Sequence, residues 1–120
     1  MSTSTPIASM ALFAAAAVLG AVGQYLYKSG ADVADGTIVG YLLNLRILAG
    51  VICYVAVMVL FITAFRIGGA LMVLYPIYAS TFIWTALLAW WAYDAPIGPT
   101  SIVGMLLLVT GMFVLGRASA

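Results

Sequence analysis

The segment LMVLYPIYASTFIWTALLAWW (residues 71–91) decides the fold, because it runs for 21 residues without a charged side chain. At about 1.5 Å per residue, a helix of that length spans about 31 Å, the thickness of the hydrocarbon core of a bilayer. Pro76 removes a backbone donor and clashes with the carbonyl of Met72, so we expect a kink there. A carbonyl freed by a kink needs a polar partner that lipid does not supply. The segment therefore predicts a membrane helix that lines a cavity.

Composition places the whole chain in the membrane. Of its 120 residues, 67% are hydrophobic and 6% are charged, whereas soluble domains carry about 25% charged residues. No polar stretch exceeds the length of a loop, so we expect one transmembrane domain over residues 1–120 and no soluble domain. The chain has no basic patch, which argues against a nucleic-acid partner.

The residues that usually carry enzyme chemistry are scarce. Histidine is absent, and Cys53 is the one cysteine. The carboxylates are Asp32, Asp35 and Asp94, all in predicted loops. No set of these side chains has the spacing of metal ligands, and no acid, base and nucleophile occur together. We therefore expect no metal, no cofactor and no enzymatic activity.

Apolar runs separated by turns predict four transmembrane helices with both termini on the same side. The predicted helices cover about residues 7–28, 46–66, 70–92 and 100–116. Residues 1–6 form a short polar tail without the basic residues of a signal peptide, so the first run is expected to remain as a helix. Ala14 to Ala17, Gly20 and Gly23 give this helix small residues for close helix contact. Residues 38–45 either lie at the membrane interface or begin the second helix.

Positive charges do not favour one orientation. Arg66 and Arg117 fall on one side of the predicted membrane domain, and Lys28 and Arg46 fall on the other. The positive-inside rule compares these numbers, and here they are equal. Four helices are also few for enclosing a substrate path. We therefore expect the chain to act as a dimer, either an antiparallel homodimer or a heterodimer with a similar four-helix chain.

Three segments together resemble the small four-helix branch of the drug/metabolite transporter superfamily. They are GAVGQYLYKSG (residues 20–30), FRIGGALMVLYPIYASTFIWTALLAWW (residues 65–91) and GMLLLVTGMFVLG (residues 104–116). Their order, their spacing and the chain length carry the resemblance, which covers nearly the whole chain. It implies a dimeric membrane transporter in the cell (inner) membrane, with Gly104 and Gly111 of the last helix at the dimer interface.

Two subfamilies of this branch differ in the first helix. The small multidrug resistance proteins carry a membrane-embedded glutamate eight residues before a lysine, and the matching residue here is Gly20. Subunits of the aminoarabinose-phosphoundecaprenol flippase lack that glutamate, and they resemble this chain at Gln24, Lys28 and Tyr75–Pro76. One departure from their pattern is Asp94, which lies ten residues before the glycine of the last helix rather than nine.

Candidate substrate-binding residues cluster near the predicted kink and at the end of the first helix. They are Gln24, Lys28, Tyr75, Tyr78, Ser80 and Trp84. Gln24 either bonds a neighbouring helix or contacts a substrate hydroxyl or phosphate. Lys28 is either an interfacial anchor or a ligand for a lipid phosphate. The aromatic residues either pack or line a cavity.

The function expected from the resemblance is that of a flippase subunit. It would move a polar-headed lipid, such as a polyprenyl-phosphate-linked sugar, between leaflets without a buried proton-coupling carboxylate. One alternative is a small multidrug or metabolite exporter of the same superfamily. Another is a non-transporting membrane scaffold or accessory subunit. In each case the lipid bilayer is a partner.

Overall fold

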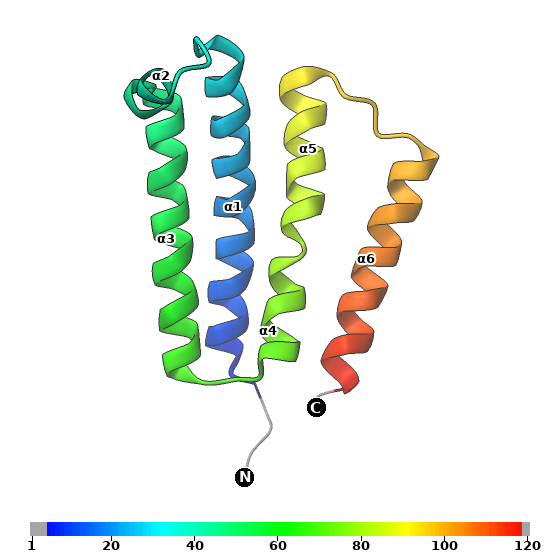
Figure 1. Cartoon of the computed structure of the whole chain (residues 1–120). Helices are drawn as coiled ribbons and strands as arrows, with labels where there is room; N and C mark the ends of the chain where they lie inside the picture. Colours follow the sequence, from blue (N-terminus) through cyan, green and yellow to red (C-terminus); the bar gives the residue numbers. More distant parts are fainter. Residues whose placement is uncertain (1–4, 119–120) are drawn as a thin grey trace.

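The computed structural model describes residues 5–118, and its regular secondary structure is helical throughout this range. The helices are α1 (Ile7–Val33), α2 (Ile38–Leu43), α3 (Leu45–Ile67), α4 (Leu71–Tyr78), α5 (Thr81–Tyr93) and α6 (Pro99–Ala118) (Figure 1). The all-α prediction is therefore confirmed. Most of the polar tail predicted at residues 1–6 lies outside the described residues.

Within residues 5–118, four helical spans are long and apolar enough to cross a membrane. They are Ile7–Val33, Leu45–Ile67, Leu71–Tyr93 and Pro99–Ala118, which fits a multi-pass membrane protein. The second and fourth spans begin and end within two residues of the predicted bounds. Pro99 is the first residue of α6, where its missing N–H group costs no hydrogen bond.

The first span differs from the prediction, because α1 continues five residues past Lys28 to Val33. Gly30 lies within the helix and against α3, where its carbonyl accepts a hydrogen bond from Asn44 Nδ2 at 3.1 Å. Asn44 also caps α3, since its Oδ1 accepts from the amides of Arg46 and Ile47. This contact between helices stabilises a last turn that the loop-like local sequence does not favour.

The third span consists of two helices, α4 and α5, instead of one continuous helix. The interruption lies at Ala79 and Ser80, one turn after Pro76. Here the amides of Ser80 and Phe82 bond carbonyls three residues earlier, as in a 3₁₀ turn. The helix is thus disturbed close to the predicted position, and the tightened turn follows the proline.

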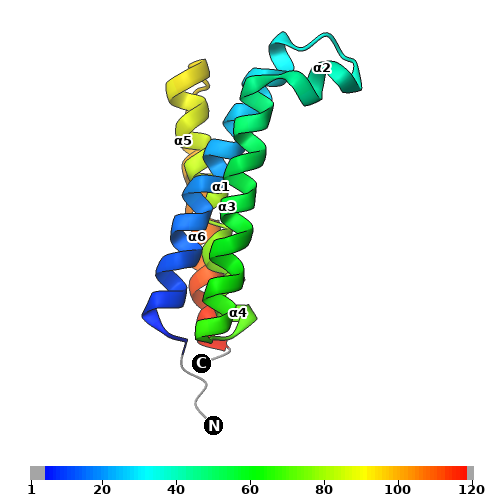
Figure 2. The same ribbon diagram turned by 90° about the vertical axis from the view of Figure 1, so that its left-hand side faces the viewer.

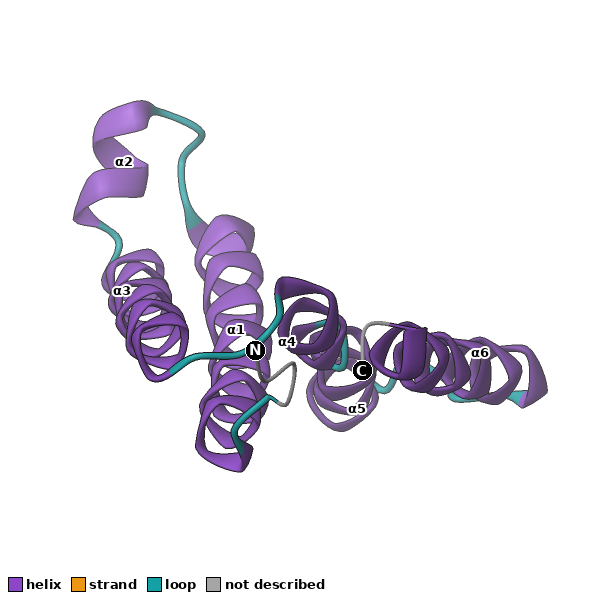
Figure 3. Cartoon of the chain, turned by 90° about the horizontal axis from the view of Figure 1, so that it is seen from below, coloured by secondary structure: helices purple, strands orange, loops and turns teal. Residues whose placement is uncertain are grey.

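The helices form a flat row in which α1 lies between α3 and the α4–α5 span, and α6 lies on the far side of that span (Figure 3). α1 contacts α3, α4 and α5, and α6 packs against α4. Seen from below, α6 lies at the edge of the row, far from α3 (Figure 3). The Cα positions extend over 53 × 37 × 18 Å. Much of the apolar surface of the spans is therefore uncovered within one chain.

Small residues allow α1 and α3 to pack closely, as the sequence predicted. Ala16, Ala17, Gly20, Ala21 and Gly23 of α1 are buried. A Cβ on Gly50 of α3 would lie 3.1 Å from the carbonyl oxygen of Gly23, so the backbones approach too closely for a larger residue. The rings of Tyr27 and Tyr54 stack beside this contact, with centroids 5.4 Å apart.

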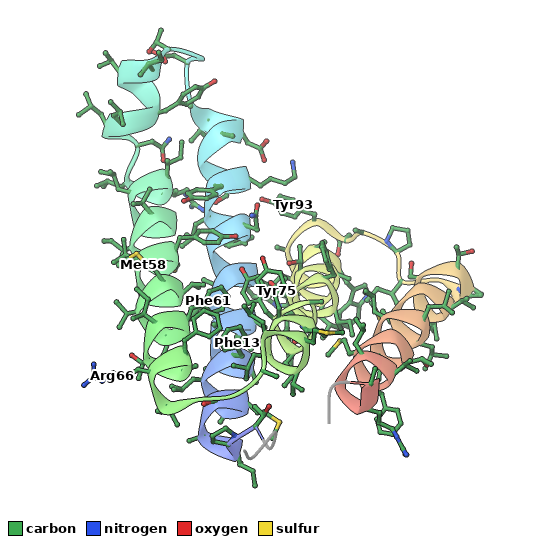
Figure 4. The ribbon with its side chains drawn as sticks, turned by 60° about the horizontal axis from the view of Figure 1, so that its bottom comes forward. Phe13, Met58, Phe61, Arg66, Tyr75 and Tyr93 are labelled. Carbon is green, nitrogen blue, oxygen red and sulfur yellow. The ribbon has the colours of Figure 1, made fainter. Side chains whose placement is uncertain are left out.

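The most buried part of the chain lies where α1 begins. Phe13 is fully buried with Ala64 and Leu74, and its ring stacks on Phe61 at 4.3 Å (Figure 4). Ser9 Oγ lies 3.0 and 2.7 Å from the carbonyl oxygens of Ala64 and Gly68. These contacts hold the start of α1 against α3 and α4 at one end of the molecule.

The opposite end carries α2, which joins α1 to α3. Its axis runs across the direction of the long helices and projects to one side (Figure 2). Thr37 Oγ1 caps it by accepting from the Gly40 amide at 3.0 Å. The sequence allowed residues 38–45 either an interfacial position or the start of the next helix, and the structure has a separate helix here.

Candidate functional site

A groove between α1 and α5 brings several polar side chains together on a largely apolar lining. We call it the α1–α5 groove, and it consists of two adjoining cavities. The Lys28 cavity, of about 300 Å³, is lined by Ala21, Gln24, Tyr25, Lys28, Thr85, Leu88, Ala89, Tyr93 and Ala95. The hydroxyl cavity, of about 390 Å³, is lined by Gln24, Tyr54, Tyr78, Thr81, Phe82 and Thr85. Gln24 and Thr85 line both cavities, so the two lie side by side.

Lys28 provides the positive charge of the groove. Its Nζ lies 3.6 Å from Asp32 Oδ1, one helical turn further along α1. It also lies 5.2 Å from the centre of the Tyr93 ring, which is a cation–π distance. Both side chains of the ion pair are more than half exposed, so the pairing is weak and leaves the ammonium available to an anion. The Tyr93 ring lies beside α1 at the end of α5 (Figure 4).

The hydroxyl cavity contains a chain of hydrogen bonds between α1 and α3. Gln24 Nε2 donates to Tyr54 Oη at 2.6 Å, and Tyr54 Oη donates to the Gly20 carbonyl at 3.1 Å. These bonds hold the side-chain amide of Gln24 beside the cavity. Its amide oxygen, Oε1, is a further hydrogen-bond acceptor. The interpretation of Gln24 as a helix–helix contact is thus confirmed, and the same residue lines both cavities.

Two further hydroxyl groups converge on Gly20. A Cβ at this position would lie 2.5 Å from Tyr78 Oη and 3.3 Å from Thr81 Oγ1. Thr81 Oγ1 is buried and has no hydrogen-bond partner among the described residues. A buried hydroxyl without a partner costs about 1–3 kcal/mol. Glycine at position 20 therefore leaves room for polar groups that a side chain there would displace.

The structure brings together three of the six predicted substrate-binding residues: Gln24, Lys28 and Tyr78. Gly20, Gln24 and Lys28 succeed each other at intervals of four residues, which places them along one side of α1. Gln24 and Lys28 both line the Lys28 cavity, as residues on one side of a helix can.

Tyr75, Ser80 and Trp84 do not line the α1–α5 groove. Tyr75 packs its ring against Phe61, with centroids 6.3 Å apart (Figure 4), and its exposed edge lies in a second groove. The Ser80 carbonyl accepts from the amides at the start of α5. Trp84 of α5 is 42% exposed.

The second groove lies between α4 and α6 and has a volume of about 460 Å³. Its lining is Tyr75, Pro76, Ala79, Gly104, Leu107, Leu108, Gly111, Met112 and Leu115. A Cβ on Gly104 or Gly111 would meet no atom within 4 Å. The two predicted dimer-interface glycines therefore contribute no close helix contact within the single chain. Pro76, the predicted kink, lies in this groove as well.

Sequence reasoning missed Tyr54, Thr81 and Thr85 as site residues. Thr81 and Thr85 are four residues apart and so share a face of α5, which was an available signal. Tyr54 is a lone polar residue near the middle of an apolar span, where an unpaired hydroxyl would be costly. Its pairing with Gln24 becomes visible only when α1 and α3 are brought together.

The described residues contain no group of three or more His, Cys, Asp or Glu side chains that could hold a metal ion. Cys53 is a free, partly buried thiol. The chemistry available in the groove is therefore hydrogen bonding, one positive charge and aromatic contact.

Comparisons of the chain with protein-family models, with curated proteins and with solved structures found no match.

Proposed function

We propose that this chain is one subunit of a dimeric flippase of the cell (inner) membrane. It moves a polar-headed lipid of the polyprenyl-phosphate-linked sugar type between leaflets. The observation that carries the proposal is the α1–α5 groove, in which polar groups extend from Lys28 to the hydroxyl cavity between spans that are otherwise apolar. Polar side chains at this depth are costly unless they serve a partner or a path.

The mechanism follows from the arrangement of the groove. Lys28 attracts the lipid phosphate at one end, and the hydroxyl and amide groups replace the water around the sugar as it moves inward. The lipid tail stays in the bilayer beside α5, which has no buried residue between Thr81 and Tyr93. A partner subunit, placed antiparallel, offers an equivalent groove from the other leaflet.

Proton coupling is not part of this proposal. A proton-coupled exporter of cations needs a titratable anion in the membrane that either the proton or the substrate neutralises. Neither cavity has a carboxylate among its lining residues. Flipping is then driven by the difference in concentration that synthesis on one side and consumption on the other maintain.

Dimerisation is supported by α6. None of its residues from Pro99 to Ala118 is buried within the chain, although it is a membrane span. Its glycines have no side chains, so the backbone of a second helix can come close at these positions. In the proposed dimer, α6 packs against α6 of the partner and both termini of each chain lie on one side of the membrane.

A flipping assay tests the proposal. Purified protein is reconstituted into liposomes that contain polyprenyl-phosphate glucose with a fluorescent label on the sugar, and dithionite reports the label that reaches the outer leaflet. The wild type should expose the inner label, and Lys28→Gln should slow this about tenfold or more. Thr110→Val is the control, because the Thr110 hydroxyl bonds the Leu106 carbonyl within α6, away from the groove.

Failure of the assay separates the remaining candidates. If folded, dimeric protein leaves the label protected, the flippase proposal is wrong. Efflux of a cationic dye coupled to a proton gradient would then favour the multidrug exporter. If neither lipid nor dye moves, the chain is an assembly subunit.

A further inference from the structure

We propose that the α1–α5 groove selects a head with one anionic group and an uncharged, hydroxyl-rich remainder. Among lipid-linked sugars it takes a neutral sugar in preference to an amino sugar. This inference rests on the proposed function for the kind of ligand, and it adds which member of that class fits the groove.

The selection begins with the distribution of charge. Lys28 is the one charged residue among those that line the two cavities. Its carboxylate neighbour, Asp32, pairs with it from the following turn of α1 and is not a lining residue. The groove therefore presents one positive charge to a ligand and no negative charge. A single phosphate at the Lys28 end satisfies it.

The hydroxyl cavity then receives the remainder of the head. Its polar groups come from four helices: Gln24 of α1, Tyr54 of α3, Tyr78 of α4, and Thr81 and Thr85 of α5. Hydroxyl groups both donate and accept, so they match the hydroxyls of a sugar. Thr81 Oγ1, which is buried without a partner among the described residues, gains one from such a ligand. The Phe82 ring in the same lining provides an apolar surface for a sugar face.

A protonated amino group fits this cavity poorly. Burying an ammonium without a carboxylate partner leaves its charge uncompensated. A neutral sugar of the same size keeps the hydrogen bonds and avoids this cost.

Binding of a matched pair of probes tests the inference. Citronellyl-phosphate glucose and citronellyl-phosphate glucosamine are titrated against the protein in nanodiscs. The sugar-free reference is citronellyl methyl phosphate, a phosphodiester with the same single negative charge. The glucose probe should bind about tenfold more tightly than the glucosamine probe. Thr81→Val should remove most of the affinity that glucose adds over the sugar-free reference, and Lys28→Gln should weaken all three probes. Thr110→Val again serves as the control.

The results separate this inference from the proposed function. Equal or tighter binding of the glucosamine probe, or no selective binding of either sugar, overturns the inference even if both lipids are flipped. Selective binding of glucose without flipping upholds the site and overturns the transport proposal. An unchanged glucose preference in folded Thr81→Val would show that the hydroxyl cavity is not the source of selection.

A second inference comes from α2 and is independent of transport: we infer that α2 lies along the membrane surface with one face in the acyl region. Ile38, Val39, Leu42 and Leu43 are each more than 60% exposed. Their spacing places them on one face of the helix. α2 joins the ends of two membrane spans and runs across their direction (Figure 2), so the bilayer surface is the partner that this face meets.

Spin labels on α2 test this position. In a Cys53→Ser background, a nitroxide is attached at Leu42→Cys or at Tyr41→Cys, which lies off the apolar face. In liposomes, the label at position 42 should collide more with oxygen than with a water-soluble nickel chelate, and the label at position 41 should show the reverse. Equal, nickel-dominated collisions at both positions would place α2 in water and overturn the inference.

Discussion

The α1–α3 pair and α6 are membrane spans of similar composition that use their glycines differently. In the α1–α3 pair, Gly23 and Gly50 face each other so closely that an added Cβ on either would collide with the opposite helix. In α6, Gly104 and Gly111 face open space within the chain. One pair of helices is complete in the monomer, and the other helix still has a surface to cover. Small residues thus mark a close approach in the α1–α3 pair, and in α6 they mark the surface at which we propose that a second chain packs.

The largest loss of unfolding free energy should come from a large side chain placed at the close contact between α1 and α3. In Gly50→Leu, the new side chain meets the ring of Tyr27, which lies 2.7 Å from the position of a Cβ. Overpacking of this kind costs about 3 kcal/mol of unfolding free energy. Thermal unfolding in detergent should show it, and a stability equal to that of the wild type would contradict the close contact.

A smaller loss of unfolding free energy should follow when the N-terminal cap of α3 is removed. Asn44→Ala removes the acceptor for the first amides of α3 and the donor to the Gly30 carbonyl. Loss of a cap costs about 1 kcal/mol. The same unfolding measurement checks it, and amide exchange should increase in the last turn of α1 around Gly30. Unchanged exchange there would contradict the account of why α1 extends to Val33.

Gly111→Leu, the same substitution in α6, should change the unfolding free energy of the monomer by less than about 0.5 kcal/mol. The reason is that nothing in the chain lies within 4 Å of a Cβ at this position. If α6 forms the dimer interface, the dimer dissociation constant should rise about tenfold or more. Förster transfer between labelled chains in liposomes measures it. An unchanged constant would place the interface elsewhere.

The smallest expected effect is a shift in the pKa of Asp35, in the loop between α1 and α2. The amide and hydroxyl of Thr37 donate to the Asp35 carboxylate and lower its pKa. The stabilisation is therefore complete above the ordinary pKa of about 4 and is lost as the pH falls through the lowered value. Thr37→Val removes the hydroxyl donor and should move the pKa of Asp35 upward. A carboxyl ¹³C NMR titration between about pH 2 and 6 measures it, and an unchanged pKa would show that the hydroxyl does not contribute.

The sequence predicted the spans well because apolar length is a local property. It predicted the small-residue face of α1 for the same reason, since helical spacing alone places Gly20 and Gly23 on one side. It did not predict the last turn of α1, because that turn depends on Asn44, a residue beyond the loop. The kink predicted at Pro76 corresponds to the interruption at Ala79 and Ser80, one turn later along the chain.

Prediction of the site was partial for a similar reason. Gln24, Lys28 and Tyr78 carry polar groups in apolar runs, which is visible in the sequence. Tyr75 looks equivalent to Tyr78, three residues later, yet the two line different grooves. Tyr75 faces α6 and Tyr78 faces α1 and α3, and the positions of these neighbouring helices do not follow from the spacing of the two residues.

Photocrosslinking tests most directly whether the lipid head uses the α1–α5 groove. Benzoylphenylalanine replaces Phe82, which lines the hydroxyl cavity, or Phe113, which is exposed on α6. Each variant is irradiated in liposomes with radiolabelled polyprenyl-phosphate glucose. We predict labelling at position 82 that unlabelled lipid competes away, and only background labelling at position 113. Equal or stronger competed labelling at position 113 would contradict the assignment of the groove.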